Sequence, residues 1–202
     1  MKKSLIAMGL LAVFGVAQAV PSLDVSGGSW VSFTNYGTTG PALQTGTLVG
    51  GYTGQMSLVD GPGVVTFTYL GSNAGDKNRF TFDVAGYFLS KGAAVSSVGD
   101  SLSLRLNSGV LDFNFKDTYR ANPAAANGSD FSRFAFTEVT SGPGFGTYDY
   151  FVSFNDYGSK DHDFNDLVVG VSVSPIPEPE TYALMLAGLG VVGFMARRRK
   201  QA

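Results

Sequence analysis

The sequence predicts an all-β fold, a β-sandwich or jelly roll, for the central part of this 202-residue chain. Short segments with a period of two alternate with turn signals, and no central segment shows a 3.6-residue period of helical length. The chain also has 27 glycines and 13% aromatic residues, which is typical of many short strands joined by glycine-rich turns. About eight short strands with such regular punctuation favour a sandwich-like architecture.

The expected strands follow one another between recognisable turns. The segment 64–70, for example, lies between Gly61-Pro62-Gly63 and Gly71-Ser72-Asn73, and the segment 101–106 leads through Asn107-Ser108-Gly109 into the next one. Residues 121–128 read as a loop because they combine proline, asparagine and glycine. The strand order is left open. In chain order, the alternating segments are residues 30–35, 64–70, 79–84, 86–89, 101–106, 110–115, 131–139, 148–154 and 167–173.

Both charge and composition restrict the classes of function. The first three residues hold two of the 14 cations and the C-terminus holds four, while Glu178 and Glu180 account for two of the 16 acids. The central part therefore has 8 cations and 14 acids, a net charge of −6. Such a surface repels phosphate backbones, so we expect no nucleic-acid partner. With no cysteine and one histidine, thiol chemistry and disulfides are excluded and most zinc sites are disfavoured.

The N-terminus predicts a secretory signal peptide over residues 1–19. Lys2 and Lys3 precede an apolar run over residues 5–16, and Ala17-Gln18-Ala19 has the small-residue pattern of a cleavage site. We expect cleavage by signal peptidase between Ala19 and Val20. The apolar run is too short for a permanent membrane anchor.

The C-terminus combines three features in a fixed order. Pro177-Glu178-Pro179-Glu180-Thr181 precedes an uncharged run, and four cations follow it. The prolines predict an extended strip, because they lack an N–H and cannot continue a sheet or lie within a helix. At about 1.5 Å per residue the run spans roughly 24 Å, so we expect a short transmembrane helix over residues 181–196. The positive-inside rule would keep the cations cytoplasmic and the central part outside.

This segment resembles the PEP-CTERM sorting signal of Gram-negative bacteria, through PEPxT, Ala183-Leu184, Gly188-Leu189-Gly190 and the final RRRK. In that family an exosortase, a membrane transpeptidase-like enzyme, recognises the signal. The resemblance implies an inner-membrane-anchored precursor whose tail is removed, with the body released or attached at the cell surface. An ordinary tail anchor is the alternative. The sorting residues implied are Pro177, Glu178, Pro179, Thr181, Arg197, Arg198 and Arg199.

A dense group of oxygen ligands lies just before the last expected strand. Four aspartates and one asparagine fall within the eleven residues 156–166. Neighbouring carboxylates repel one another unless a cation or hydrogen-bond donors neutralise them, and hard oxygen ligands on a loop suit Ca²⁺. A metal-free turn, in which Asp and Asn bond the local backbone, explains the pattern equally well. The candidate Ca²⁺ ligands are Asp156, Asp161, Asp163, Asn165 and Asp166.

The same stretch has a second resemblance. Asp161-His162-Asp163-Phe164-Asn165-Asp166 followed by Leu167-Val168-Val169 is similar to the ending of DUF4114-type secreted β-domains, as is the run Gly71 to Gly75 leading to Asn78-Arg79-Phe80. Calcium binding is often suspected in that family, which implies the same for Asp161, Asp163 and Asp166. Lys160 in the loop would weaken the affinity for a cation.

Other candidate residues give weaker signals. His162 and Ser159 lie in the acidic loop, but no nucleophile-elbow pattern accompanies them. Asp112 and Asp117 could pair as the acid and base of a hydrolase, but nothing in the sequence places them together in a cleft. Trp30, Tyr36 and Tyr52 could form a sugar-stacking platform, although aromatic residues in strands are more often part of the core.

We therefore expect three regions: a signal peptide (1–19), an exported β-domain (20–174) and a sorting segment (175–202). The expected function is a non-enzymatic structural or adhesive role at the cell surface, in the outer envelope or in the extracellular matrix. The first alternative is a carbohydrate-binding module for exopolysaccharide, and the second is a secreted hydrolase.

Overall fold

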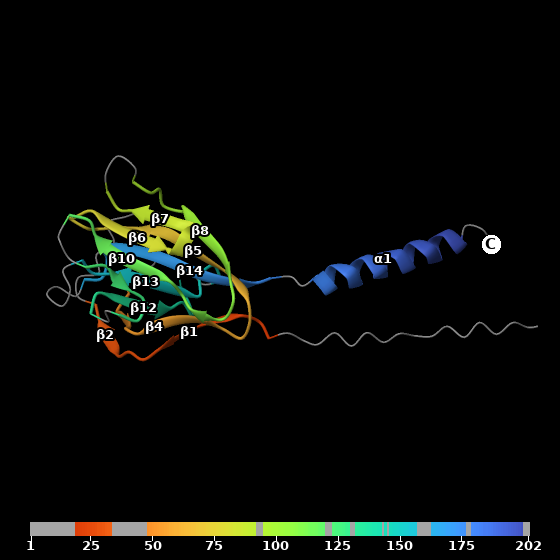
Figure 1. Ribbon diagram of the computed structural model, residues 1–202, viewed down its shortest axis with the longest axis horizontal. Coiled ribbons are helices and arrows are strands. Elements are labelled where there is room, and N and C mark those ends of the chain that lie inside the picture. Colours follow the sequence, from red (N-terminus) through yellow and green to blue (C-terminus); the bar gives the residue numbers. More distant parts are fainter. Residues whose placement is uncertain are drawn as a thin grey trace, which may run out of the picture.

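The computed structural model confirms a mostly β architecture with antiparallel sheets and one C-terminal helix (Figure 1). It describes residues 19–33, 48–91, 95–119, 123–129, 132–142, 144, 146–156, 163–176 and 179–199. The strands are β1 (Ser22–Ser26), β2 (Trp30–Ser32), β3 (Gly50–Tyr52), β4 (Gln55–Val59), β5 (Gly63–Gly71), β6 (Asn78–Phe82), β7 (Gly86–Leu89), β8 (Ser101–Leu106), β9 (Gly109–Val110), β10 (Phe113–Asp117), β11 (Ala125–Ala126), β12 (Phe134–Glu138), β13 (Tyr150–Phe154) and β14 (Leu167–Pro175). The helices are the 3₁₀ helix η1 (Asp83–Ala85) and α1 (Pro179–Arg199).

The strands form three sheets in the described part of the chain. The largest has the order β2-β3-β12-β13-β14-β5-β8, the second β11-β10-β6-β7 and the third β1-β4-β9. Strand β14 lies between β13 and β5, so the last strand before the C-terminal segment is an inner strand of the largest sheet. Its Gly170 makes room for Tyr148, because a Cβ at this glycine would lie 2.5 Å from the tyrosine ring.

The core lies between the largest sheet and the sheet that contains β6 and β10. Phe67 of β5 contacts Phe80, Phe82 and Phe113, with ring centroids 4.9, 4.6 and 5.3 Å away. All four side chains have no exposed surface. Alternating residues of β5 point inward, as the period of two predicts. The two sheets therefore share one aromatic core, whereas a sandwich or jelly-roll topology stays a prediction.

Several details differ from the expected strands. Strands β1, β3 and β4 lie outside the expected segments because they are short, with few apolar residues. The two-residue strand β11 lies within the expected loop. The turn Asn107-Ser108-Gly109 leads from one sheet to another, because β8 pairs with β5 and β9 pairs with β4. Pairing partners that are distant in sequence decide these points, and the local pattern does not reveal them.

The C-terminal helix α1 extends away from the β-body (Figure 1). In the part of the chain that the structure describes, no helix is long and apolar enough to cross a membrane. This finding corrects the expected transmembrane helix over residues 181–196. The uncharged run there is short, three glycines interrupt it, and Glu180 and the arginines lie next to its ends.

Candidate functional site

The acidic turn predicted from the sequence connects β13 to β14, which are antiparallel neighbours. The structure describes both ends of this turn, and Asp161 lies outside the described residues, as do His162 and Ser159. Asp156 and Asp166 are each 6% exposed. Because aspartates are almost never this buried unless they are paired, their partners determine what the turn can do.

Donors from the protein surround these two carboxylates. The backbone N–H of Asp156 donates to Asp166 Oδ2 at 2.7 Å, and Asn78 Nδ2 donates to Asp156 Oδ2 at 2.9 Å. Arg133 Nη2 donates to the backbone oxygen of Asp156 at 3.2 Å, and the hydroxyl of Ser72 donates to the backbone oxygen of Asp166. These bonds offset the cost of removing the polar groups from water.

Phe164 holds the turn against the body. Its backbone φ of 46° lies in the left-handed region, which residues other than glycine rarely adopt. Its ring is 1% exposed and stacks on Phe33, with the centroids 4.8 Å apart. Burial of the ring thus offsets the backbone strain, and the next residue, Asn165, is also buried, at 1% exposed.

The described residues of the turn form a hydrogen-bonded structure. A direct hydrogen bond brings Asp156 and Asp166 together, and Asp163 and Asn165 belong to the same turn. Among the described residues, no three His, Cys, Asp or Glu side chains gather closely enough to hold a metal ion. Calcium binding stays a prediction, because one of the candidate ligands, Asp161, lies outside the described residues.

A second candidate site lies at the margin of the largest sheet. It is a groove of about 440 Å³, and we call it the aromatic groove. Trp30 and Tyr52 pair across β2 and β3, with their rings edge to face and the centroids 5.2 Å apart. Trp30 and Tyr52 are 50% and 55% exposed, so the interpretation of these two aromatic residues as part of the core is wrong. Tyr36, the third residue of the suggested platform, lies outside the described residues. The main lining residues are Val25, Trp30, Tyr52, Thr137, Glu138 and Tyr150.

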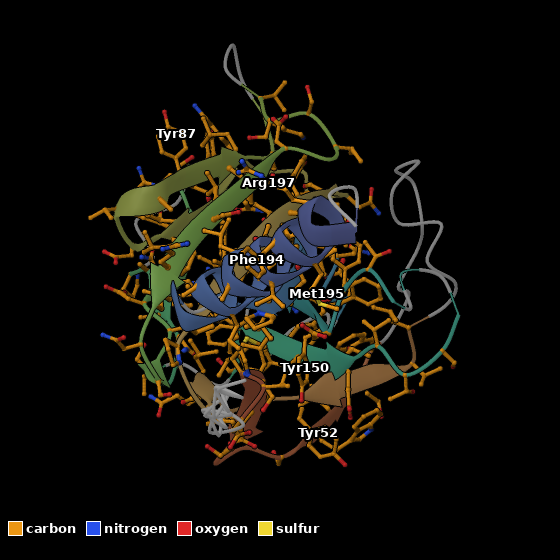
Figure 2. The ribbon with its side chains drawn as sticks, turned by 90° about the vertical axis from the view of Figure 1, so that its right-hand side faces the viewer. Tyr52, Tyr87, Tyr150, Phe194, Met195 and Arg197 are labelled. Carbon is orange, nitrogen blue, oxygen red and sulfur yellow. The ribbon has the colours of Figure 1, made fainter. Side chains whose placement is uncertain are left out.

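The strand register explains why these side chains meet. Tyr52 lies opposite Phe136, and Glu138 lies opposite Tyr150. Directly paired residues share a face of the sheet, as do alternate residues along one strand, so all four side chains lie on one face. Phe136 is 1% exposed in the core, whereas Glu138 is exposed. The groove therefore begins where the core ends, and Figure 2 shows Tyr52 and Tyr150 on the same side of the body.

The groove has an acidic environment. Burial raises the pKa of the Tyr150 phenol, and the carboxylates of Glu138, Asp24 and Asp149 raise it further. Negative charges have this effect because they oppose the formation of a phenolate. A ligand in this groove therefore meets aromatic rings and negative potential together.

The carboxylate pair considered for a hydrolase does not share a cleft. Asp117 is fully buried, and its Oδ1 accepts a hydrogen bond from the Tyr119 backbone N–H at 2.8 Å. Asp112 is exposed, at the residue before β10. One side chain is therefore inside the fold and the other is on its surface.

Both predicted processing sites lie at the ends of the β-body. Val20 is 71% exposed and β1 begins two residues later, while residues 1–18 lie outside the described part. At the other end, Pro175 pairs with Gly63 in the last register position of β14. Pro177 and Glu178 follow and are not among the described residues. Removal of residues 1–19 and of the residues after Pro175 would leave every described strand pairing intact.

Comparison with known proteins identifies the C-terminal segment. The family model of the PEP-CTERM protein-sorting motif matches residues 175–200. No curated protein and no solved structure matches the chain significantly. The resemblance of the C-terminal residues to the PEP-CTERM sorting signal is confirmed. The resemblance of the β-body to DUF4114-type domains stays a prediction. The motif implies an exported, membrane-anchored precursor that exosortase processes. The chain thus carries a PEP-CTERM protein-sorting motif that begins at Pro175, the final residue of the last strand of its β-body.

Proposed function

We propose that the protein is an exosortase substrate whose β-body acts at the cell surface in a structural or adhesive role, without enzymatic activity. The observation that carries this proposal is the position of the sorting motif. The motif covers residues 175–200, and β14 ends at Pro175. Exosortase can therefore remove the motif without disrupting the sheet, which would leave a folded domain outside the inner membrane, in the outer envelope or the extracellular matrix.

The composition supports a role without catalysis. The chain has no cysteine and one histidine, which leaves few groups for nucleophilic or general-base chemistry. The two carboxylates considered for hydrolysis differ in burial, with Asp117 inside the fold and Asp112 exposed. In an adhesive role the partner would be a polymer outside the cell, and we propose exopolysaccharide.

We further propose that Ca²⁺ stabilises the turn between β13 and β14. The support is the number of oxygen ligands in this turn and the burial of Asp156 and Asp166. The described side chains do not form a metal cluster by themselves, so the proposal requires Asp161 as well. The alternative is the metal-free turn, which the hydrogen bonds of Asn78 and Arg133 favour.

Substitution of Glu178, the acid of the Pro-Glu-Pro triplet, tests the sorting proposal. In a Gram-negative host that contains exosortase, Glu178→Ala should block processing, so that the unprocessed precursor accumulates in the inner membrane fraction. Glu180→Ala is a closely matched control, because Glu180 is the same residue type two positions along, at the variable position of PEPxT. Immunoblots of membrane and external fractions measure the result.

Two comparisons make this test decisive. A host without exosortase should accumulate precursor of the wild type and of both variants. Processing of the Glu178→Ala variant at the wild-type rate in the exosortase-containing host would contradict recognition of this motif.

A further inference from the structure

Trp30 is held in the aromatic groove by its contact with a glycine. A Cβ on Gly50 would lie 2.6 Å from Trp30 Cζ2 and 2.9 Å from Cε2, so the indole occupies the space that a larger residue would fill. Half of the Trp30 surface nevertheless remains exposed. Tyr52 meets it edge to face and is also half-exposed. The two rings thus form a fixed apolar wall that is accessible from solvent.

Polar groups line the rest of the groove. The Thr137 hydroxyl is not one of them: it donates to the Gly50 carbonyl at 2.9 Å from the other face of the sheet, because Thr137 lies between Phe136 and Glu138 on β12. Glu138 and Thr140 are exposed, and Tyr150 completes the lining. Among the described residues that line the groove, none is a lysine or arginine. The described lining therefore offers the hydroxyls of Thr140 and Tyr150 and the negative charge of Glu138.

We propose that the aromatic groove binds a polysaccharide of hexose units that are neutral or carry free amines. This proposal rests on the proposed adhesive function and names its ligand class. A hexose ring has an apolar C–H face that fits aromatic rings and a rim of hydroxyl donors that fits acceptors such as Glu138. Free amines add cation–π and charge attraction, whereas uronic acids are repelled by Glu138 and the nearby Asp24 and Asp149.

Calorimetric titration of the purified exported protein with three probes tests the proposal. The probes are oligomers of glucose, of glucosamine and of uronic acid. We expect binding of the glucosamine or glucose oligomers and none of the uronic-acid oligomer. Trp30→Ala and Tyr52→Ala should each weaken binding by about tenfold or more, as loss of an aromatic anchor does. Glu138→Gln should weaken binding of the glucosamine oligomer more than that of the glucose oligomer.

Tyr87→Ala is the control for Tyr52→Ala, because these tyrosines are 54% and 55% exposed and Figure 2 shows Tyr87 on the other side of the body. It should leave binding unchanged, and the melting temperature of each variant reports whether the variant folds. Equal binding by wild type, Trp30→Ala and Glu138→Gln would overturn the proposal, as would preference for uronic acid or the absence of binding to all three probes. So would self-association that is lost in Trp30→Ala without any glycan binding. Each of these failures leaves processing at the sorting motif unchanged, so they contradict the glycan ligand and not sorting by exosortase, whose own failure would appear as wild-type processing of Glu178→Ala.

Discussion

At the scale of single residues, burial decides what each polar side chain can do. Asp156 and Asp166 are nearly inaccessible and are held by protein donors, so they act first on the stability of the turn. Glu138 and Tyr150 lie opposite each other in the register at the end of the core, where a ligand can reach the exposed carboxylate. The sequence contains all four residues, but their exposure depends on strand pairings that its local pattern does not reveal.

The raised pKa of the Tyr150 phenol leads us to expect a loss of stability at alkaline pH. Its pKa is raised above the ordinary 10.0 by burial, with contributions from Glu138, Asp24 and Asp149. In the unfolded chain the phenol ionises at its ordinary pKa, so the unfolded state binds fewer protons above that pH. The contribution of the Tyr150 phenol to the free energy of unfolding is complete below pH 10, and it is lost as the pH rises through the pKa of the folded state.

Titration of the Tyr150→Phe variant measures this effect. The free energy of unfolding of the wild type, from urea denaturation, should fall more steeply above pH 10 than that of the variant. Tyr87→Phe, at an exposed position on β7, is the control and should retain the wild-type slope. Identical slopes for the wild type and Tyr150→Phe would show that the Tyr150 environment does not affect stability.

At the scale of elements, the sequence predicts strands in which alternation is long and flanked by clear turns, and it misses β1 and β4, where alternation is short. Strand β5 and the β13–β14 pair lie where alternation and flanking turns indicate them. The alternation in β1 and β4 is carried by few apolar residues, and only their mutual pairing identifies them as strands. The aromatic groove is formed by β2, β3 and β12, and β12 is far from the other two in the chain. The sequence therefore suggested Trp30 and Tyr52 as candidates, but it could not place Glu138 beside them.

The β13–β14 turn predicts a response to calcium. If Ca²⁺ binds there, a concentration of about 100 times Kd should stabilise the fold by about 2.7 kcal/mol. For a domain of this size, that corresponds to a rise in Tm of about 5–10 °C. Differential scanning calorimetry in excess Ca²⁺ and in EDTA should show this difference, and Asp163→Asn should reduce it.

Two controls separate a specific site from general charge effects. Asp112→Asn removes an exposed carboxylate outside the turn and should leave the calcium response unchanged. Mg²⁺ at the same concentration should stabilise the fold less than Ca²⁺, because it requires a stricter octahedral geometry. A Tm that is the same in Ca²⁺ and in EDTA would identify the metal-free turn instead.

At the scale of the whole molecule, a β-body lies between a predicted signal peptide and a PEP-CTERM sorting motif. Strand β1 begins at Ser22, just after the predicted signal-peptidase site, and β14 ends at Pro175, where the sorting motif begins. The described sheets lie between these two positions, and α1 extends beyond them (Figure 1). The physical consequence is that export and sorting can be completed without any change in the packing of the aromatic core.

The intact mass of the protein recovered from outside the cells shows whether both ends are removed during export and sorting. We expect a species that begins at Val20, lacks the segment that follows the β-body, and is correspondingly lighter than the 21.2 kDa chain. Any additional mass at its new C-terminus would identify a group attached during sorting. Recovery of the unprocessed 202-residue chain from the external fraction would contradict the account.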